Sequence, residues 1–338
     1  MSYHVDLATL CIFHMIRAFL KTVLVLVPFA FGMAFATAEQ PGKDQDITLS
    51  TPTGQIAGSL QLPATKGKVP VLLLIAGSGA TDRDGNSLGI KGKNNAFKML
   101  AESLSQAGIA TVRFDKRGVG ASLAATKQES ELRFENYVDD AASWLKLLKG
   151  DERFSNVFVL GHSEGSLIAI LAAQKESVQG LISLAGPAKN AAELIRQQLQ
   201  GKLTPQQMSI SDEALTSLQA GKLYENPPPE LNFLYRSSVQ PFLISYFRFT
   251  PEKEIVKLNC HVMLILGDND IQVDVKQIAA LKAARPDADM LLVHNMNHVS
   301  KIVTGDIAKN LAAYGDPSLP LPAELVEGVT GFLKHHSR

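Results

Sequence analysis

A serine in a glycine-flanked turn is the first candidate for chemistry in this sequence. Residues 161–165 read Gly-His-Ser-Glu-Gly, which fits the pattern G-x-S-x-G with Ser163 at its centre. An apolar run of strand length, 156–160, precedes this turn, and a run of helical character, 167–174, follows it. The glycines two positions before and after the serine permit a strained backbone. The pattern predicts a nucleophile elbow, with Ser163 as the nucleophile.

A serine hydroxyl needs a neighbouring base, and that base needs an acid to orient it. In a parallel sheet, reactive groups collect at the carboxyl ends of the strands. His298 lies on the loop just after the predicted strand 290–294, so we expect it to be the base, with His294 as the second choice. His261 precedes its strand and lies at the wrong end of the sheet, whereas His162 is expected to point away from the neighbouring serine.

The acid is expected on the loop that follows the predicted strand 262–266. Residues 267–273 read Gly-Asp-Asn-Asp-Ile-Gln-Val, which offers two carboxylates. Asp270 sits deeper in the loop and is better placed to reach the base, and Asp268 is the second choice. An aspartate-rich surface turn without a catalytic role is the alternative interpretation. The predicted order along the chain is nucleophile, acid and base.

A serine nucleophile also needs backbone N–H donors for the oxyanion of its tetrahedral intermediate. Glu164, directly after the serine, is expected to supply one donor through its backbone. The second is expected after the strand 69–76, at Ser78 or at Gly79.

The glycine-rich loop 77–86 resembles nucleotide-binding and calcium-binding loops, but its residues do not fit either pattern. The third glycine position of a dinucleotide fingerprint holds Asp82, and the loop lacks the Gly-Lys-Ser/Thr ending of a phosphate loop. A calcium loop would need a glycine at another position and a terminal glutamate. We therefore expect no metal and no nucleotide cofactor.

The elements that must position these residues alternate between strands and helices. Strands are expected at 46–50, 55–62, 69–76, 109–114, 156–160, 180–185, 262–266 and 290–294, and helices at 96–107, 137–148, 167–174, 274–284 and 323–335. This alternation predicts an α/β fold with a mostly parallel central sheet flanked by helices. The first two strands are expected to form an antiparallel hairpin at one edge of the sheet.

A long insertion, 188–257, separates two of the predicted strands and is expected to be a helical lid or cap. Two short amphipathic helices are expected near 194–203 and 214–223. An aromatic cluster follows three prolines, and Phe242 and Tyr246 within it are predicted to bind the acyl part of a substrate. The alternative is that these rings only pack the insertion against the body of the protein.

The amino-terminal segment has the pattern of a secretory signal peptide. Arg17 and Lys21 precede an apolar stretch, 22–35, and Ala36-Thr37-Ala38 is a suitable cleavage site. We expect a signal peptide at 1–38, a mature domain at 39–338, and export to the periplasm or the medium, although the start at Met15 and cleavage after residue 36 are alternatives. A membrane anchor is less favoured, because the apolar stretch is shorter than the ~20 residues that span a bilayer.

The composition is that of a globular protein with a large core. The chain has 338 residues, of which 46% are hydrophobic and 20% charged, and its 33 basic residues balance its 33 acidic ones. This balance argues against a nucleic-acid partner. The predicted mature chain keeps only Cys260, so an internal disulfide is excluded. The sequence does not indicate an oligomeric state.

The motifs together resemble the α/β-hydrolase superfamily, and within it a group of bacterial serine esterases with a Gly-Ser-Gly-x-x-Asp-Arg-Asp-Gly-Asn loop. The likeness extends over residues 76–86, 113–122, the serine elbow, the acid loop and the Asn-His at the base. The resemblance implies that Asp82, Arg83 and Asp84 border the oxyanion loop and that residues 113–122 are chiefly structural.

The residues and the resemblance together predict an exported carboxylesterase that cleaves short- to medium-chain acyl esters through an acyl-enzyme. Ser163, Asp270 and His298 would be its catalytic residues, and a small-molecule ester its partner, without stable membrane insertion after cleavage. A peptidase or thioesterase of the same fold is the first alternative. A binding protein that retains the fold is the alternative from another class, and a membrane-bound acyltransferase is less favoured.

Overall fold

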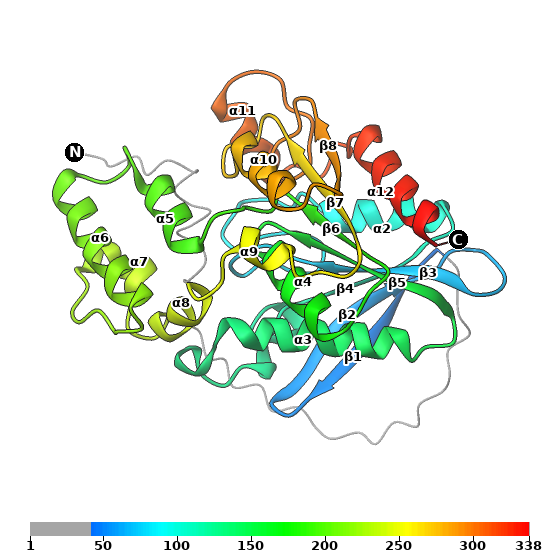
Figure 1. Cartoon of the computed structure of the whole chain (residues 1–338), viewed down its shortest axis with the longest axis horizontal. Helices are drawn as coiled ribbons and strands as arrows, with labels where there is room; N and C mark the ends of the chain where they lie inside the picture. Colours follow the sequence, from blue (N-terminus) through cyan, green and yellow to red (C-terminus); the bar gives the residue numbers. More distant parts are fainter. Residues whose placement is uncertain (1–41, 338) are drawn as a thin grey trace.

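One mixed eight-stranded sheet forms the centre of the protein (Figure 1). The computed structural model describes residues 42–337, so the predicted signal peptide at 1–38 lies outside the described residues. The strands are β1 Asp44–Thr51, β2 Gly54–Gln61, β3 Val69–Ile75, β4 Ala110–Phe114, β5 Phe154–His162, β6 Gly180–Leu184, β7 His261–Gly267 and β8 Asp289–Val293.

The order of the strands across the sheet is β1-β2-β4-β3-β5-β6-β7-β8. β1 and β2 pair antiparallel, as do β2 and β4, while the remaining neighbours are parallel. The predicted mostly parallel sheet with an antiparallel hairpin at its edge is therefore confirmed. Because β4, β3 and β5 are adjacent and parallel, the loops that follow them leave the sheet side by side.

Helices cover both faces of the sheet. The helices of the described residues are α2 Ala96–Gln106, α3 Phe134–Lys149, α4 Glu164–Lys175, α5 Ala191–Leu199, α6 Pro205–Gln219, α7 Asn232–Tyr235, α8 Gln240–Tyr246, α9 Pro251–Ile255, α10 Val275–Ala284, α11 Ile307–Ala312 and α12 Ala323–His336. Short 3-10 turns lie at Gly120–Ala125, Glu129–Glu131, Pro229–Leu231 and Ala313–Gly315. No helix within residues 42–337 is long and apolar enough to cross a membrane.

The alternation of side chains along β3 divides the core into two layers. Val71, Leu73 and Ile75 point to the face that α3 and α4 cover, and Leu72 and Leu74 point to the face that α2 and α12 cover. All five side chains are at most 1% exposed. A strand buried on both faces needs a continuous apolar run, which is the pattern of residues 69–76.

Helix boundaries differ from the predicted ones where side chains cap the first turn. α3 begins three residues before the predicted start at Tyr137, because the side chain of Asn136 accepts a hydrogen bond (2.8 Å) from the backbone N–H of Arg133. α4 begins directly after Ser163, earlier than the apolar periodicity indicates. The short helix α11 was not predicted.

The insertion between β6 and β7 carries α5 to α9. Its helices α5 to α8 extend away from the sheet on one side, whereas α9 lies beside α4 (Figure 1). Its first two helices end before their predicted ends, at Leu199 and Gln219. α6 starts at a capping box, in which Thr204 and Gln207 satisfy each other's backbone N–H groups. The prediction that this insertion acts as a lid stays a prediction.

Candidate active site

Ser163 lies in a sharp turn between the end of β5 and the first residue of α4. Its backbone has φ 54° and ψ −121°, a conformation that residues other than glycine rarely adopt. A Cβ on Gly161 would lie 2.0 Å from the carbonyl oxygen of Gly165, and a Cβ on Gly165 would lie 2.4 Å from the carbonyl oxygen of Ile75. Only glycine fits at these two positions, so the motif holds Ser163 in the strained turn.

His298 lies on the loop after β8 and is paired with Asp270 on the loop after β7. The His298 Nδ1–H donates to Oδ2 of Asp270 over 2.7 Å, and both side chains are buried, at 5% and 0% exposure. The other carboxylate oxygen of Asp270 accepts backbone N–H groups from Gln272 (2.7 Å) and Val273 (3.0 Å). These bonds fix the carboxylate and leave Nε2 of His298 as its unprotonated nitrogen.

The two alternative residues form a second pair outside this site. His294 Nδ1 lies 2.7 Å from Oδ2 of Asp268, the same distance as in the first pair. The His294 side chain is 80% exposed, however, and that of Asp268 is 32% exposed. Neither residue lines the pocket that contains Ser163.

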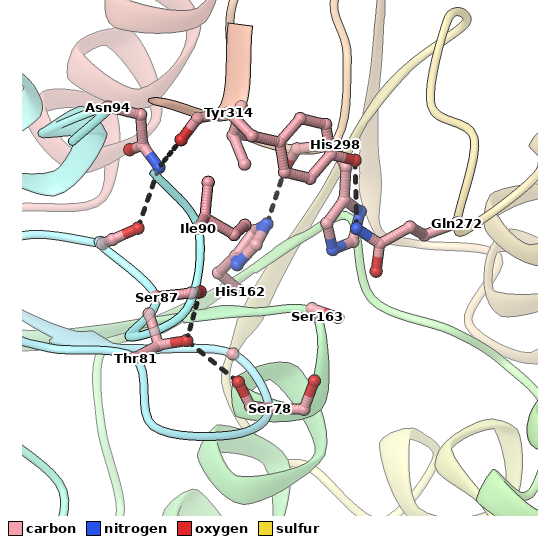
Figure 2. Close-up of a pocket in the computed structure, with 13 residues that line it drawn as sticks. Ser78, Thr81, Ser87, Ile90, Asn94, His162, Ser163, Gln272, His298 and Tyr314 are labelled. Carbon is pink, nitrogen blue, oxygen red and sulfur yellow. Dashed lines mark hydrogen bonds between the residues drawn. The ribbon is translucent and has the colours of Figure 1, made fainter. Parts of the chain in front are cut away.

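A small pocket of about 50 Å³ contains Ser163, His298 and Ser78 (Figure 2). Polar side chains make up much of its remaining wall. Thr81 donates to the carbonyl oxygen of Ser78 (2.9 Å), and the amide of Gln272 donates to the hydroxyl of Tyr314 (3.0 Å). The structure therefore brings together the predicted nucleophile, base and first candidate oxyanion residue.

The loop between β3 and α2, which carries Ser78, is anchored by partly buried ion pairs at its Asp-Arg-Asp segment. Arg83 donates to Asp115 over 2.8 Å, and Arg113 donates to Asp84 over 2.8 Å. Asp82 accepts the backbone N–H groups of Asp84 and of Asn86, both at 2.9 Å. These contacts attach the loop to the end of β4, so the charged residues of this segment stabilise the conformation of the loop.

Glu164 is the first residue of α4 and is 3% exposed. N–H groups in the first turn of a helix have no intrahelical acceptor, and the helix dipole adds partial positive charge there. The backbone N–H of Glu164 can therefore serve an anion at Ser163.

His162 was expected to point away from Ser163, but its side chain lines the pocket that contains Ser163. Its ring lies 4.7 Å from the ring of His298, centroid to centroid, and its Nε2–H donates to the backbone carbonyl of His298 (2.8 Å). The ring also packs edge-on against Phe97. It lines the pocket that contains Ser163 (Figure 2). His162 thus braces the loop that carries the base. In the sequence, the one signal for this role was the position of His162 next to Ser163 in the motif.

The His162 contact predicts a dependence of stability on pH. Burial, and then the neighbouring His298, lower the pKa of His162 from 6.5 to about 3. Below pH 6.5 the unfolded chain therefore binds a proton that the folded protein does not bind. We expect this group to lower the free energy of unfolding by about 1.4 kcal/mol for each pH unit below 6.5.

Urea unfolding of the wild type and of His162→Gln between pH 4.5 and 8 measures this slope. The variant should lose stability less steeply as the pH falls. His294→Gln is the matched control, because that side chain is 80% exposed and should leave the slope unchanged. Equal slopes for the wild type and His162→Gln would contradict the prediction.

Phe242 and Tyr246 lie in a packed aromatic group at the base of the insertion. Tyr246 stacks on Phe134 of α3 with a centroid distance of 4.3 Å, and Phe242 meets Tyr137 of α3 edge-on at 5.7 Å. Phe242 is 5% exposed and Tyr246 is 8% exposed, and neither lines the pocket that contains Ser163. Their predicted contact with substrate stays a prediction.

The part of the chain that the structure describes shows no group of three or more His, Cys, Asp or Glu side chains that could hold a metal ion. Asp82 and Asp84 instead accept hydrogen bonds from the protein itself.

Comparisons with known proteins agree on the architecture. A family model described as serine aminopeptidase, S33, matches residues 89–227, a stretch that contains Ser163 but neither Asp270 nor His298. Esterase EstD of Thermotoga maritima is 29% identical over 260 residues, which cover 76% of this chain and 60% of the relative. The chain thus matches less than two thirds of that relative's length.

Two solved structures extend the comparison. Est1E from Butyrivibrio proteoclasticus with bound ferulic acid has a TM-score of 0.59 and 17% identity, covering 86% of this chain and 98% of that one. The alpha/beta hydrolase GrgF from Penicillium sp. sh18 has a TM-score of 0.56 and 15% identity, covering 87% and 99%. With its sheet order and its serine elbow after β5, this chain has the α/β-hydrolase fold.

Proposed function

We propose that this chain is a serine hydrolase that cleaves carboxylic esters through an acyl-enzyme. The observation that carries the proposal is one pocket that contains both a strained serine elbow and His298, whose Nδ1–H is bonded to the buried Asp270. The relative from Thermotoga maritima, which is named an esterase, supports esters as the substrate class.

In the proposed reaction, Ser163 Oγ attacks the ester carbonyl carbon while Nε2 of His298 accepts its proton. Asp270 stabilises the imidazolium that forms. The negative charge on the carbonyl oxygen is held by the backbone N–H of Glu164 and by that of Ser78. His298 then protonates the leaving alcohol, and the same ring activates the water that releases the acid and frees Ser163.

The substrate is proposed to be a short- to medium-chain acyl ester. The pocket beside Ser163 is small and partly polar, which supports the short end of this range. A peptidase is the second candidate, because the family model that matches residues 89–227 is described as a serine aminopeptidase. A thioesterase would use the same residues, and a binding protein of this fold would show no turnover.

A panel of p-nitrophenyl esters from acetyl to decanoyl, set against aminoacyl p-nitroanilides, separates these functions. We expect ester kcat/KM to exceed anilide kcat/KM by orders of magnitude. If an apolar wall binds the acyl chain, each added methylene should raise kcat/KM about fourfold until the pocket is full, since burying a CH₂ is worth ~0.8 kcal/mol. Anilides turned over faster than every ester would favour the peptidase.

The same panel tests the two aromatic residues. As acyl-wall residues, Phe242 and Tyr246 should shift the chain-length optimum towards longer esters when either is replaced by alanine. As packing residues, they should leave the optimum unchanged and lower stability, by about 3–5 kcal/mol for Phe242→Ala. Phe332→Ala is a matched control, because this ring is also 5% exposed but packs on Phe158 in the other core layer.

Export is also proposed, from the signal-like segment at 17–38. Mass spectrometry of the protein from its native host should show an amino-terminus near Glu39. An intact amino-terminus on a cytoplasmic protein would contradict export without bearing on the hydrolase proposal.

A further inference from the structure

A lysine side chain is completely buried beside the proposed oxyanion hole. Lys116 lies on the loop after β4, and its side chain is 1% exposed. β4 neighbours β3 in the sheet, and β3 neighbours β5, so this loop lies next to the loops that carry Ser78 and Ser163. A buried ammonium group is costly unless it is paired, so its contacts at this place need an explanation.

The Lys116 ammonium contacts both segments from which the oxyanion donors are expected. Its Nζ donates to the backbone carbonyl of Gly77 over 2.5 Å. It also forms an ion pair with Oε1 of Glu164 over 3.3 Å, and that carboxylate is 2% exposed. The ring of Tyr137 lies 4.9 Å from Nζ and adds a cation–π contact.

The Gly77 contact acts directly on one oxyanion donor. The carbonyl of Gly77 and the N–H of Ser78 belong to the same planar peptide group, so holding the carbonyl oxygen also fixes the direction of the N–H. A charged donor on the oxygen polarises the peptide and makes its N–H a stronger donor. This peptide is close to the nucleophile, since a Cβ on Gly77 would lie 3.2 Å from the Cβ of Ser163.

The Glu164 contact acts on the other donor. The side chain of Glu164 anchors the residue whose backbone N–H begins α4. Its second oxygen, Oε2, is buried and has no hydrogen-bond partner among residues 42–337. The carboxylate is therefore incompletely satisfied, while the ammonium lies 0.8 Å closer to the Gly77 oxygen than to Oε1 (2.5 Å against 3.3 Å). A purely structural ion pair would favour the opposite arrangement.

We propose that Lys116 is a positioning residue for the oxyanion hole, which aligns and polarises the Gly77–Ser78 peptide and fixes Glu164 beside it. This inference rests on the proposed function and assigns a role to a segment, 113–122, that the resemblance treats as structural. It also favours Ser78 over Gly79 as the second donor, because the carbonyl oxygen of the peptide before Gly79 is bound by the neutral hydroxyl of Thr81 and not by a charged group.

The test is the kinetics of Lys116→Met and of the double variant Lys116→Met/Glu164→Gln on p-nitrophenyl acetate. The double variant leaves no unpaired buried charge, so it keeps the test valid if the single variant does not fold. We expect both to lower kcat by about 10²–10³-fold, the range for loss of one oxyanion donor, with KM changed less than about threefold. Affinity for a trifluoromethyl ketone, which forms an oxyanion with the serine, should fall in parallel.

Matched controls come from the next residue along the chain. Arg117 forms a comparable buried ion pair with Asp140 (2.5 Å). The hydrogen bonds of Arg117 do not reach Gly77 or Glu164. Arg117→Met and Arg117→Met/Asp140→Asn should lower stability but retain kcat.

A double Lys116→Met/Glu164→Gln variant with wild-type kcat would overturn the proposal, because Lys116 would then only neutralise Glu164. A loss of kcat in Thr81→Val but not in Lys116→Met would also overturn it, in favour of Gly79. A wild-type chain with neither esterase turnover nor fluorophosphonate labelling would overturn the proposed function together with this inference.

Discussion

Replacement of Ser163 by alanine is expected to lower ester turnover by about 10⁶-fold, as loss of the nucleophile does in a serine protease. The expectation follows from the turn that holds this residue, with φ 54°, between β5 and α4. The turn places Ser163 in the same pocket as His298. The variant should also lose all labelling by a fluorophosphonate, which reacts only with an activated serine.

The control for this variant is Ser87→Ala. Ser87 lines the same pocket, but its hydroxyl is hydrogen-bonded to that of Thr81 (2.9 Å), and Ser87 does not lie in the strained turn before α4. The Ser87→Ala variant should still be labelled by the fluorophosphonate. The two variants should unfold at similar temperatures. Labelling that persists in folded Ser163→Ala would assign the nucleophile to another serine.

The sequence predicts those parts of the site that local geometry determines. Gly161 and Gly165 are needed wherever the chain makes this turn, since a Cβ at either would overlap a carbonyl oxygen. The continuous apolar runs predict buried parallel strands, and the rule for the carboxyl ends of such strands then indicates the loops that carry His298 and Asp270. The structure pairs these two residues over 2.7 Å.

Other parts of the site depend on contacts between segments that are distant in the sequence. Lys116 reaches Gly77 and Glu164 only because β4, β3 and β5 are neighbours, and no periodicity in the sequence indicates that order. The contact of His162 with the carbonyl of His298 spans 136 residues. Alternation along β5 indicates the face to which His162 points, but it does not indicate which loop lies there.

The insertion shows the same limit at a larger scale. Its aromatic residues are predictable as apolar, but their position depends on Phe134 and Tyr137 of α3. Burial against a helix and contact with an acyl chain both select large apolar rings, so composition alone cannot distinguish them. The ester panel separates the two roles by measuring function and stability in the same variants.

Asp270→Asn is expected to lower kcat by about 10³–10⁴-fold, with little change in KM. The Asp270 carboxylate accepts the Nδ1–H of His298 and is itself fixed by two backbone N–H groups. An amide at this position can donate to Nδ1, which would place the proton on Nε2 and leave His298 unable to accept the proton of Ser163. Active-site titration should show folded enzyme that is acylated slowly.

The chain contains its own matched control for this substitution. Asp268 and His294 have the same 2.7 Å separation, but the histidine is 80% exposed and neither residue lines the pocket of Ser163. Asp268→Asn should therefore change kcat less than about threefold, because a solvated pair of this kind contributes little beyond its own loop. A larger loss of kcat in Asp268→Asn than in Asp270→Asn would transfer the orienting role to Asp268. It would also require His294 to reach Ser163, which demands a rearrangement of the loop after β8 on substrate binding.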